Sequence, residues 1–289
     1  MRIGVTGAKG MLGRDLVAVL RGRGHEVLAW GRESCDVCDA GKVLGVIGET
    51  HPDLIIHAAA YTQVDKAESE PDLAMRVNGE GTRNVAMACR NRRIPMFYVS
   101  TDYIFDGAKR KPYLPEDIPN PLNVYGRSKL LGEQAVKELL DEFCIIRTSW
   151  LYGLHGQNFV YTILRLADER PELQVVNDQI GSPTWTKTLA RALADLIDVK
   201  AGGVYHVTDG CDGISWYDFA GAIIEEAGVK IRVKPVSTAE LSRPARRPAY
   251  SVLSLDETIS TLGYNVPSWR DSLCSMLACV PSGKAMVKQ

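Results

Sequence analysis

The sequence has little surplus charge of either sign and no long apolar run. Its 289 residues include 34 Lys and Arg against 35 Asp and Glu, which gives a formal net charge of -1. A surface that binds nucleic acid or an anionic membrane needs an excess of basic residues, so we expect neither partner. A membrane-spanning helix needs about 18 or more apolar residues in succession, and the sequence contains no such stretch. We therefore expect no membrane insertion.

Paired cysteines are also lacking. The seven cysteines are scattered, and only Cys35 and Cys38 stand close together, as a single C-x-x-C. A zinc site or a disulfide framework needs more such pairs, so we predict reduced thiols and no metal site. The first residues read as a strand and a turn rather than as an export signal, so we expect a cytoplasmic protein.

The chain does contain the material for an ordinary globular core. Hydrophobic residues make up 45% and charged residues 24%, which is typical of a protein with one large or two modest domains. Short apolar strands alternate with helical runs in the first half, and this order predicts an α/β fold with a doubly wound, mostly parallel (Rossmann) sheet. The predicted strands are residues 2–6, 26–30, 54–57, 94–100 and 144–148. A long helix is expected at 71–91.

The first predicted strand runs directly into a glycine-rich turn. Gly7, Gly10 and Gly13 form G-x-x-G-x-x-G, and a helical run at 11–21 follows. Glycines at this spacing allow a tight turn and a close approach to a pyrophosphate, while the helix N-terminus supplies N–H donors. The pattern predicts a dinucleotide site that includes Met11 and Leu12. A tight turn without a ligand is the alternative.

The end of the second strand indicates which cofactor binds. NAD-specific folds place an acidic residue there to bind the ribose hydroxyls, but this chain has Arg32. A guanidinium suits a 2′-phosphate, so we predict NADPH with NADH as the alternative; a solvated arginine is the competing interpretation. Asp36 and Val37 are placed beside the adenine. Small residues after the third strand leave room for the cofactor. We therefore assign Ala58, Ala59, Ala60 and the adjacent Tyr61 to the cofactor site.

The fourth predicted strand leads into Thr101, Asp102 and Tyr103. In a sheet ordered 3-2-1-4-5-6, the first and fourth strands are neighbours and ligands bind between them. This order would place Thr101 opposite the glycine loop, where its hydroxyl could contact a substrate oxygen. A threonine that caps a turn is the alternative. His57, at a buried strand end, is expected to be a core histidine rather than a base.

Tyr125 and Lys129 stand four residues apart in the stretch YGRSKLLGE. On a helix, this spacing places both side chains on one face. A free tyrosine has a pKa near 10, and a nearby ammonium lowers that pKa toward the range in which general acid–base catalysis is efficient. The pair is therefore a candidate catalytic pair, with an ordinary amphipathic helix as the alternative.

Together, these motifs resemble the extended short-chain dehydrogenase/reductase family, which carries T-G-x-x-G-x-x-G, then S-T-D, then Y-x-x-x-K. The resemblance implies that Tyr125 is the acid, Lys129 its partner and the ribose clamp, and Thr101 the third member. Segments such as HAAAYTQVDKAE, NVYGRSKLLGE and RPAYSVL resemble one branch, the dTDP-4-dehydrorhamnose reductases. That branch implies NADPH-dependent reduction of the 4-keto group of a dTDP-4-dehydro-6-deoxyhexose. Ser254 departs from the Asp or Asn often found there, a change that concerns a helix cap.

The second half of the chain has short mixed elements, which predict a smaller α/β substrate domain. We assign 1–150 to the dinucleotide-binding domain, with 182–208 returning to it. Residues 151–181 and 209–281 form the substrate domain, and 282–289 a loose tail.

Candidate ligands for a nucleotide sugar lie on both sides of this division. Arg243, Arg246 and Arg247 suit the diphosphate, with a solvated basic loop as the alternative. Trp150 and Tyr103 offer aromatic faces for the hexose, with a core role as the alternative. By resemblance, the substrate contacts also include Val64, Thr101, Asp102 and Asn158.

Other functions on the same fold stay open. A nucleotide-sugar epimerase is one alternative. A dehydratase is disfavoured, because Tyr103 stands where that group carries the acidic residue of T-D-E. The other is a non-catalytic, NADP-binding regulatory subunit like the beta subunit of methionine adenosyltransferase. The intact Thr101, Tyr125 and Lys129 favour an enzyme. The assembly state is left open, with a homodimer as one option.

Overall fold

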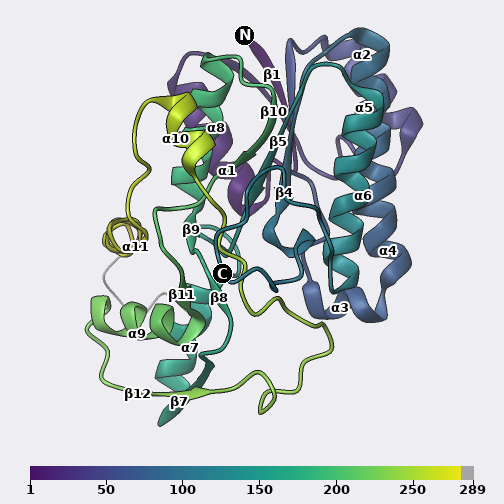
Figure 1. Ribbon diagram of the computed structural model, residues 1–289. Coiled ribbons are helices and arrows are strands. Elements are labelled where there is room, and N and C mark those ends of the chain that lie inside the picture. The colour runs from purple at the N-terminus through teal and green to yellow at the C-terminus, as the bar shows by residue number, and fades with distance from the viewer. Residues whose placement is uncertain (281–289) are drawn as a thin grey trace.

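A six-stranded, fully parallel sheet forms the centre of the computed structural model, which describes residues 1–280 (Figure 1). Its order is β10-β5-β4-β3-β1-β2. The predicted α/β class with a doubly wound parallel sheet is confirmed. The strands are β1 Arg2–Thr6, β2 Glu26–Trp30, β3 Leu54–His57, β4 Met96–Thr101, β5 Phe143–Thr148 and β10 Gly203–His206.

The predicted neighbourhood of the first and fourth strands is wrong. β1 pairs with β3, in a register from Ile3 opposite Leu54 to Thr6 opposite His57, and β4 lies on the far side of β3. Between β2 and β3 the chain forms the helix α2 (Ala40–Thr50) and no third strand in the described residues, so it crosses back after only two strands. The winding therefore reverses between β1 and β3, and the ligand crevice lies at their carboxyl ends.

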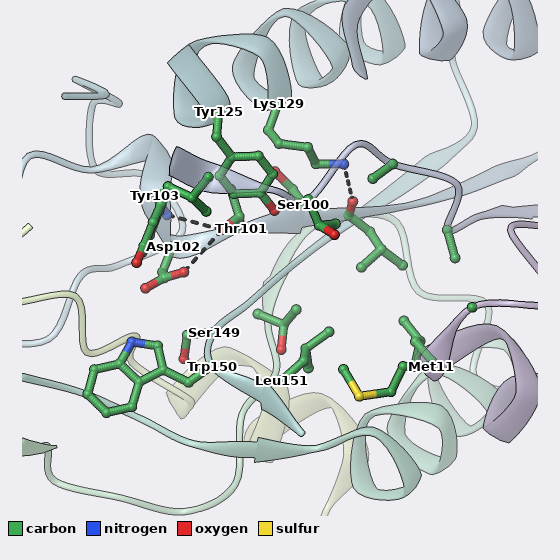
Figure 2. A pocket seen from close by; sticks show the side chains of 18 of the residues that line it. Met11, Ser100, Thr101, Asp102, Tyr103, Tyr125, Lys129, Ser149, Trp150 and Leu151 are labelled. Carbon is green, nitrogen blue, oxygen red and sulfur yellow. Dashed lines mark hydrogen bonds between the residues drawn. The ribbon is translucent and has the colours of Figure 1, made fainter. Parts of the chain in front are cut away.

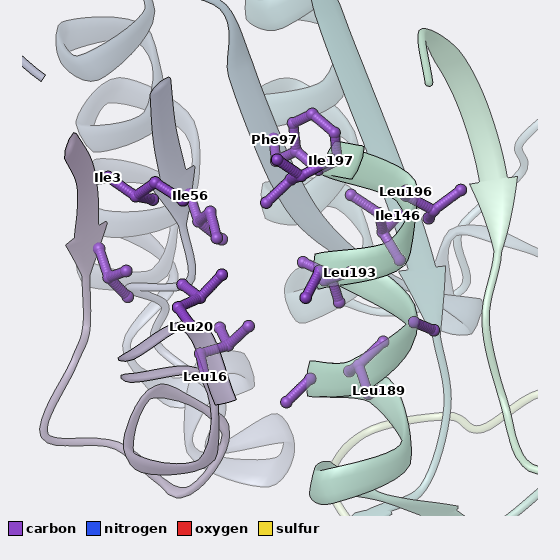
Figure 3. Packing of buried hydrophobic residues seen from close by; sticks show 14 of the residues in the cluster. Ile3, Leu16, Leu20, Ile56, Phe97, Ile146, Leu189, Leu193, Leu196 and Ile197 are labelled. Carbon is purple, nitrogen blue, oxygen red and sulfur yellow. The ribbon is translucent and has the colours of Figure 1, made fainter. Parts of the chain in front are cut away.

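Helices cover both faces of the sheet (Figure 1). α1 (Met11–Gly22) and α8 (Thr186–Asp198) lie on one face, and α2, α5 (Gly81–Arg92) and α6 (Val124–Leu139) on the other. Figure 3 shows Leu16 and Leu20 of α1 facing Leu189 and Leu193 of α8 over the strand residue Ile56, and all five are fully buried. Burial of each such side chain contributes about 1.5–3 kcal/mol, so this core fixes α1 and the glycine loop before it.

The long helix predicted at 71–91 is interrupted. It consists of α4 (Pro71–Met75), a π-helical turn (Arg76–Glu80) and α5. Asn78, inside the π-helical turn, accepts a hydrogen bond from the Tyr61 amide (2.8 Å) and donates to the Tyr61 carbonyl (3.0 Å) and to Ser128 Oγ of α6 (2.9 Å). The wider turn thus connects the loop after β3 to the helix of the predicted catalytic pair.

The remaining elements are short and mostly lie below the carboxyl edge of the sheet in Figure 1. Around the buried ring of Phe219, the helices α7 (Phe159–Glu169) and α9 (Trp216–Glu226) pack with the strands β7 (Glu172–Val176) and β12 (Arg232–Val236). The other short elements are α3 Val64–Ser69, β6 Leu151–Tyr152, β8 Ile180–Gly181, β9 Thr184–Trp185, β11 Ile214–Ser215, α10 Asp256–Leu262 and α11 Trp269–Ala278.

The division into two domains stays a prediction, although β10 does join the main sheet beside β5. The predicted loose tail at 282–289 lies outside the described residues. Every cysteine falls within the described part and is a free thiol, as predicted. Within residues 1–280, no helix is both long enough and apolar enough to cross a membrane.

Candidate active site

Two adjoining cavities open at the carboxyl ends of the central strands, and they share the glycine loop. The first has a volume of about 480 Å³ and the second about 350 Å³. Predicted residues that line the first are Gly7, Gly10, Met11, Leu12, Gly13, Ala58, Ala60, Val64, Thr101, Asp102, Tyr103, Tyr125, Lys129 and Trp150. Those that line the second are Gly7, Gly10, Arg32, Asp36, Val37, Ala58, Ala59, Ala60 and Tyr61.

The glycine loop has no room for side chains at two of its three glycines. Gly7 has a φ of +68°, and a Cβ there would lie 2.7 Å from the Ala59 amide nitrogen. A Cβ on Gly13 would lie 2.2 Å from the Gly7 carbonyl oxygen. Gly10 is the N-cap of α1, and no side chain caps the N-terminus of this helix. The resulting cradle of backbone N–H groups at a helix N-terminus fits a pyrophosphate.

The second cavity carries the residues predicted to surround the adenosine part of the cofactor. Arg32 lies at its rim with 81% of its side chain exposed, and its Nε lies 3.4 Å from Asp36 Oδ2. Asp36 in turn accepts a hydrogen bond from the Cys38 amide (3.0 Å). The guanidinium is therefore available to a ligand, and its role at a 2′-phosphate stays a prediction. Cys35, Cys38, Leu73 and Val77 also line this cavity.

Tyr125 and Lys129 occupy the first two turns of α6, whose N-cap Asn123 accepts a hydrogen bond from the Gly126 amide (2.8 Å). Lys129 is only 2% exposed, and its Nζ donates to the Val99 carbonyl (2.7 Å) (Figure 2). The same Nζ lies 4.2 Å from the centre of the Tyr98 ring. Burial lowers the pKa of Lys129 to about 7, an effect that the charge of Glu133 opposes.

The expected lowering of the Tyr125 pKa is wrong for this structure. Burial raises the pKa of Tyr125 to about 12, a hydrogen bond with Thr101 opposes the rise, and the Asp102 charge adds to it. The lysine ammonium is directed to the Val99 carbonyl rather than to the phenol, so desolvation dominates. Tyr125 is thus protonated throughout the neutral range and can act as a proton donor.

Thr101 and Asp102 form a small hydrogen-bonded unit beside the Tyr125 ring (Figure 2). Thr101 Oγ1 donates to Asp102 Oδ1 (3.1 Å) and accepts from the Tyr103 amide (3.2 Å). The second carboxyl oxygen, Asp102 Oδ2, is buried with no hydrogen-bond partner among the described residues. Burial raises the pKa of Asp102 to about 7, and side-chain hydrogen bonds with Ser251 and Thr101 oppose the rise. Asp102 also lines the first cavity, so its carboxyl group is suited to a polar ligand group, such as a hydroxyl.

The opposite wall of the cavity is aromatic. Trp150 lies across from Tyr125 in Figure 2 and stacks on Trp216, with ring centroids 3.5 Å apart. A Cβ on Gly181 would lie 2.5 Å from Trp150 Cε2, so the indole is held from behind as well. The lining of this cavity also includes residues that were not predicted, among them Trp216, Thr62, Thr148, Ser149, Leu151 and Gln157. The position of Thr148 and Ser149 at the carboxyl end of β5 was a signal that could have identified them.

Four predicted substrate residues are not among those lining either cavity. Arg247 forms two hydrogen bonds to Asp65 of α3 (3.0 and 2.8 Å), and Arg243 lies 3.5 Å from the same carboxylate. The Arg246 carbonyl accepts a hydrogen bond from the N-cap residue of α6 (2.7 Å). Asn158 caps α7 by accepting from the Tyr161 amide (3.2 Å). Their roles toward a substrate stay predictions.

His57 and Ser254 have the structural roles that the sequence predicted for them. His57 is buried between Thr6 Oγ1 (2.7 Å from Nδ1) and Thr82 Oγ1 (3.1 Å from Nε2), and burial lowers its pKa to about 3. It is the core histidine that was predicted. Ser254 Oγ accepts from the Asp256 amide (3.3 Å) at the start of α10, so the departure at this position concerns a helix terminus.

Comparisons with known proteins extend over almost the whole chain. Residues 1–281 match the family model described as RmlD substrate binding domain. A dTDP-4-keto-6-deoxy-D-glucose reductase of Streptomyces niveus is 44% identical over 254 residues, which cover 87% of this chain and 88% of that protein. A dTDP-4-dehydrorhamnose reductase of Sinorhizobium fredii is 42% identical over 283 residues, which cover 94% and 95%.

Solved structures agree with these relatives. The dTDP-4-dehydrorhamnose reductase of Bacillus anthracis in complex with NADP has a TM-score of 0.93 and 41% identity, covering 96% of this chain and 99% of that one. A UDP-glucose 4-epimerase of Brucella ovis, with a TM-score of 0.81 and 20% identity, shows only the shared fold. The resemblance inferred from the sequence motifs is confirmed. The chain belongs to the RmlD substrate binding domain family, and its relatives include dTDP-4-dehydrorhamnose reductases.

Proposed function

We propose that this protein is an NADPH-dependent oxidoreductase that reduces the 4-keto group of a dTDP-4-dehydro-6-deoxyhexose, converting dTDP-4-dehydrorhamnose to dTDP-rhamnose. The names of its relatives and the NADP in a solved structure of the same family support this activity. A cytoplasmic location is part of the proposal, because all seven thiols are free. A homodimer is compatible with the activity but is not required by it.

One observation carries the proposal. A single cavity is lined by the glycine loop and by Thr101, Tyr125 and Lys129. A pyrophosphate held at the glycine loop would leave the other end of a dinucleotide beside the tyrosine and the lysine. The carboxyl group of Asp102 and the indole of Trp150 line the remaining space, which suits the hydroxyls and the apolar face of a sugar.

NADPH supplies the hydride that reduces C4 of the sugar, and the protein supplies orientation and the proton. Tyr125 donates its phenolic proton to the oxygen that becomes an alkoxide during reduction. Thr101, hydrogen-bonded to Asp102 and next to Tyr125, holds the phenol toward the carbonyl position. Lys129 is buried beside Tyr125 and is placed to bind the ribose and to supply a positive charge near the developing negative one.

The regulatory-subunit alternative predicts cofactor binding without turnover. It has no specific support in the geometry, because a binder would not need a buried tyrosine, lysine and threonine in the same cavity. An epimerase needs the same three residues, so the difference between a reductase and an epimerase lies in the products. A reductase consumes one NADPH for each sugar, whereas an epimerase returns its cofactor unchanged.

Tyr125→Phe tests the proposal, since it removes the proton donor and keeps the volume of the ring. General acid catalysis typically contributes about 10²–10⁴-fold, so turnover should fall within that range while NADPH affinity stays close to that of the parent. The assay follows NADPH oxidation with a panel of 4-keto nucleotide sugars. Near-parent activity in Tyr125→Phe would refute the mechanism. A parent that binds NADPH but reduces none of these sugars would favour the regulatory subunit.

A further inference from the structure

A buried ion pair that the proposed mechanism does not use lies directly behind the active site. Glu133 of α6 and Arg147 of β5 each have only 1% of their side chain exposed. Arg147 Nη2 lies 2.9 Å from Glu133 Oε2, and Arg147 Nε lies 3.0 Å from Glu133 Oε1. Ser100 Oγ of β4 donates to Glu133 Oε1 (2.6 Å). The carboxylate therefore accepts three hydrogen bonds from two neighbouring strands.

Ser100 itself lines the active-site cavity, and the other two partners are close along the chain to residues that line it. Arg147 precedes Thr148, and Glu133 lies one helical turn beyond Lys129. The cluster thus joins α6 to β4 and β5 at the level of the proposed catalytic residues. A displacement of Glu133 would shift α6 along the strands and carry Tyr125 and Lys129 with it.

Stability alone does not account for an ion pair in this position. Removing two charges from water is costly, and buried pairs can often be replaced by apolar residues without loss of stability. Glu133 also acts on Lys129, because its negative charge favours the protonated lysine in a site where burial disfavours it. The carboxylate therefore has both a geometric and an electrostatic relation to the catalytic helix.

We propose that Glu133 is a positioning residue: held by Arg147 and Ser100, its carboxylate fixes α6 against β4 and keeps Lys129 protonated at the wall of the cavity. The role of Glu133 rests on the proposed function, because it concerns a residue of the proposed catalytic site. Its test by NMR titration does not depend on that function. It also explains why Arg147, the largest fully buried side chain, stands at the end of β5.

Other titratable groups face this cluster, and they define what a pH experiment will report. His206 of β10 lies 3.4 Å from Arg147 Nη1, and burial lowers the pKa of His206 to about 3. His57 of β3 is buried near Lys129, with its pKa also lowered to about 3. Tyr98 of β4 lies under the lysine, and burial raises its pKa well above 10. None of these three titrates near neutral pH, so a transition there belongs to Lys129 or to Asp102.

The experiment measures the protonation of Lys129 directly, by NMR titration of protein labelled with ¹³C at lysine Cε. The Lys129→Met variant assigns the signal. In Glu133→Gln, the titration midpoint of Lys129 should fall by roughly one pH unit, the change expected when a neighbouring opposite charge is removed. The pH above which turnover declines should fall by the same amount. Ser100→Ala, which removes one hydrogen bond from the same carboxylate and keeps every charge, should leave the midpoint in place.

A second variant covers the case in which Glu133→Gln leaves Arg147 unpaired and does not fold. Glu133→Gln combined with Arg147→Met removes both charges and should still lower the Lys129 midpoint, by a smaller amount. An unchanged midpoint in the folded variants would overturn the proposal, as would an equal shift in Ser100→Ala. A parent without reductase activity would refute the proposed function instead, because the NMR titration requires no sugar substrate.

Discussion

Gly13→Ala tests whether the glycine loop is shaped by backbone contacts rather than by chance. The added Cβ would lie 2.2 Å from the Gly7 carbonyl oxygen and 2.7 Å from Ala8 Cα, and both contacts are with backbone that cannot rotate away. Overpacking of this kind costs about 1–3 kcal/mol, while replacing a helical glycine by alanine gains about 0.5–1 kcal/mol. The free energy of unfolding should therefore fall by up to about 2.5 kcal/mol. The loop should also open and lose its fit to a pyrophosphate.

Gly45→Ala is the matched control, because Gly45 also lies in a helix but has no atom within 4 Å of an added Cβ. This variant should be stabilised by about 0.5–1 kcal/mol and should bind NADPH like the parent. Both are compared by thermal unfolding with and without NADPH. At a concentration 100 times its Kd, the cofactor should stabilise the parent and Gly45→Ala by about 2.7 kcal/mol, and Gly13→Ala by much less. Equal stability and equal cofactor response in the two variants would refute the reasoning.

Three further outcomes are expected. Arg32→Ala should weaken NADPH binding more than NADH binding, and equal losses would remove Arg32 from the 2′-phosphate. Arg247→Ala should raise the KM for the sugar nucleotide about tenfold or more, since a charge-assisted hydrogen bond contributes about 1.5–3 kcal/mol. Arg243→Ala should have a smaller effect, because the Arg243 side chain is 56% exposed and is held only by a 3.5 Å contact with Asp65. An unchanged KM in both variants would show that the diphosphate binds elsewhere. Burial lowers the pKa of His57 to about 3, so the unfolded chain binds a proton below pH 6.5 that the folded protein excludes. Stability should then fall between pH 6.5 and 3 by up to ~1.4 kcal/mol per pH unit, and a His57→Gln variant with an undiminished slope in denaturant unfolding would contradict this.

Local patterns in the sequence were sufficient for much of the fold. The strand at Arg2–Thr6, the glycine loop and the helix from Met11 follow one another without a gap, and the structure has the same boundaries to within one residue. Tyr125 and Lys129 lie on one helix because their spacing and the N-cap Asn123 are local features. In both cases the determining interactions lie within about one turn of the residues concerned.

Features that depend on contacts between distant residues could not be predicted in this way. The order of the sheet depends on whether a third strand forms after β2, and the single segment there is helical. The guanidinium of Arg247 is bound by Asp65, 182 positions earlier in the sequence, a contact that no local pattern indicates. The Tyr125 pKa was misjudged for a related reason, since it depends on burial by several segments rather than on the lysine one turn away.

The π-helical turn at Arg76–Glu80 has a consequence for the evolution of the gene. Such a turn contains one residue more than an α-helical turn, so a single-codon deletion here could be absorbed by a regular helix without unfolding it. The segment before the deletion would, however, rotate by about 100° relative to α5. Asn78 would then lose its hydrogen bonds to Tyr61, which lines the second cavity, and to Ser128, which precedes the proposed catalytic lysine. A deletion within a helix is usually selected against because it disrupts folding. In this turn, a deletion would be selected against because it disrupts cofactor binding.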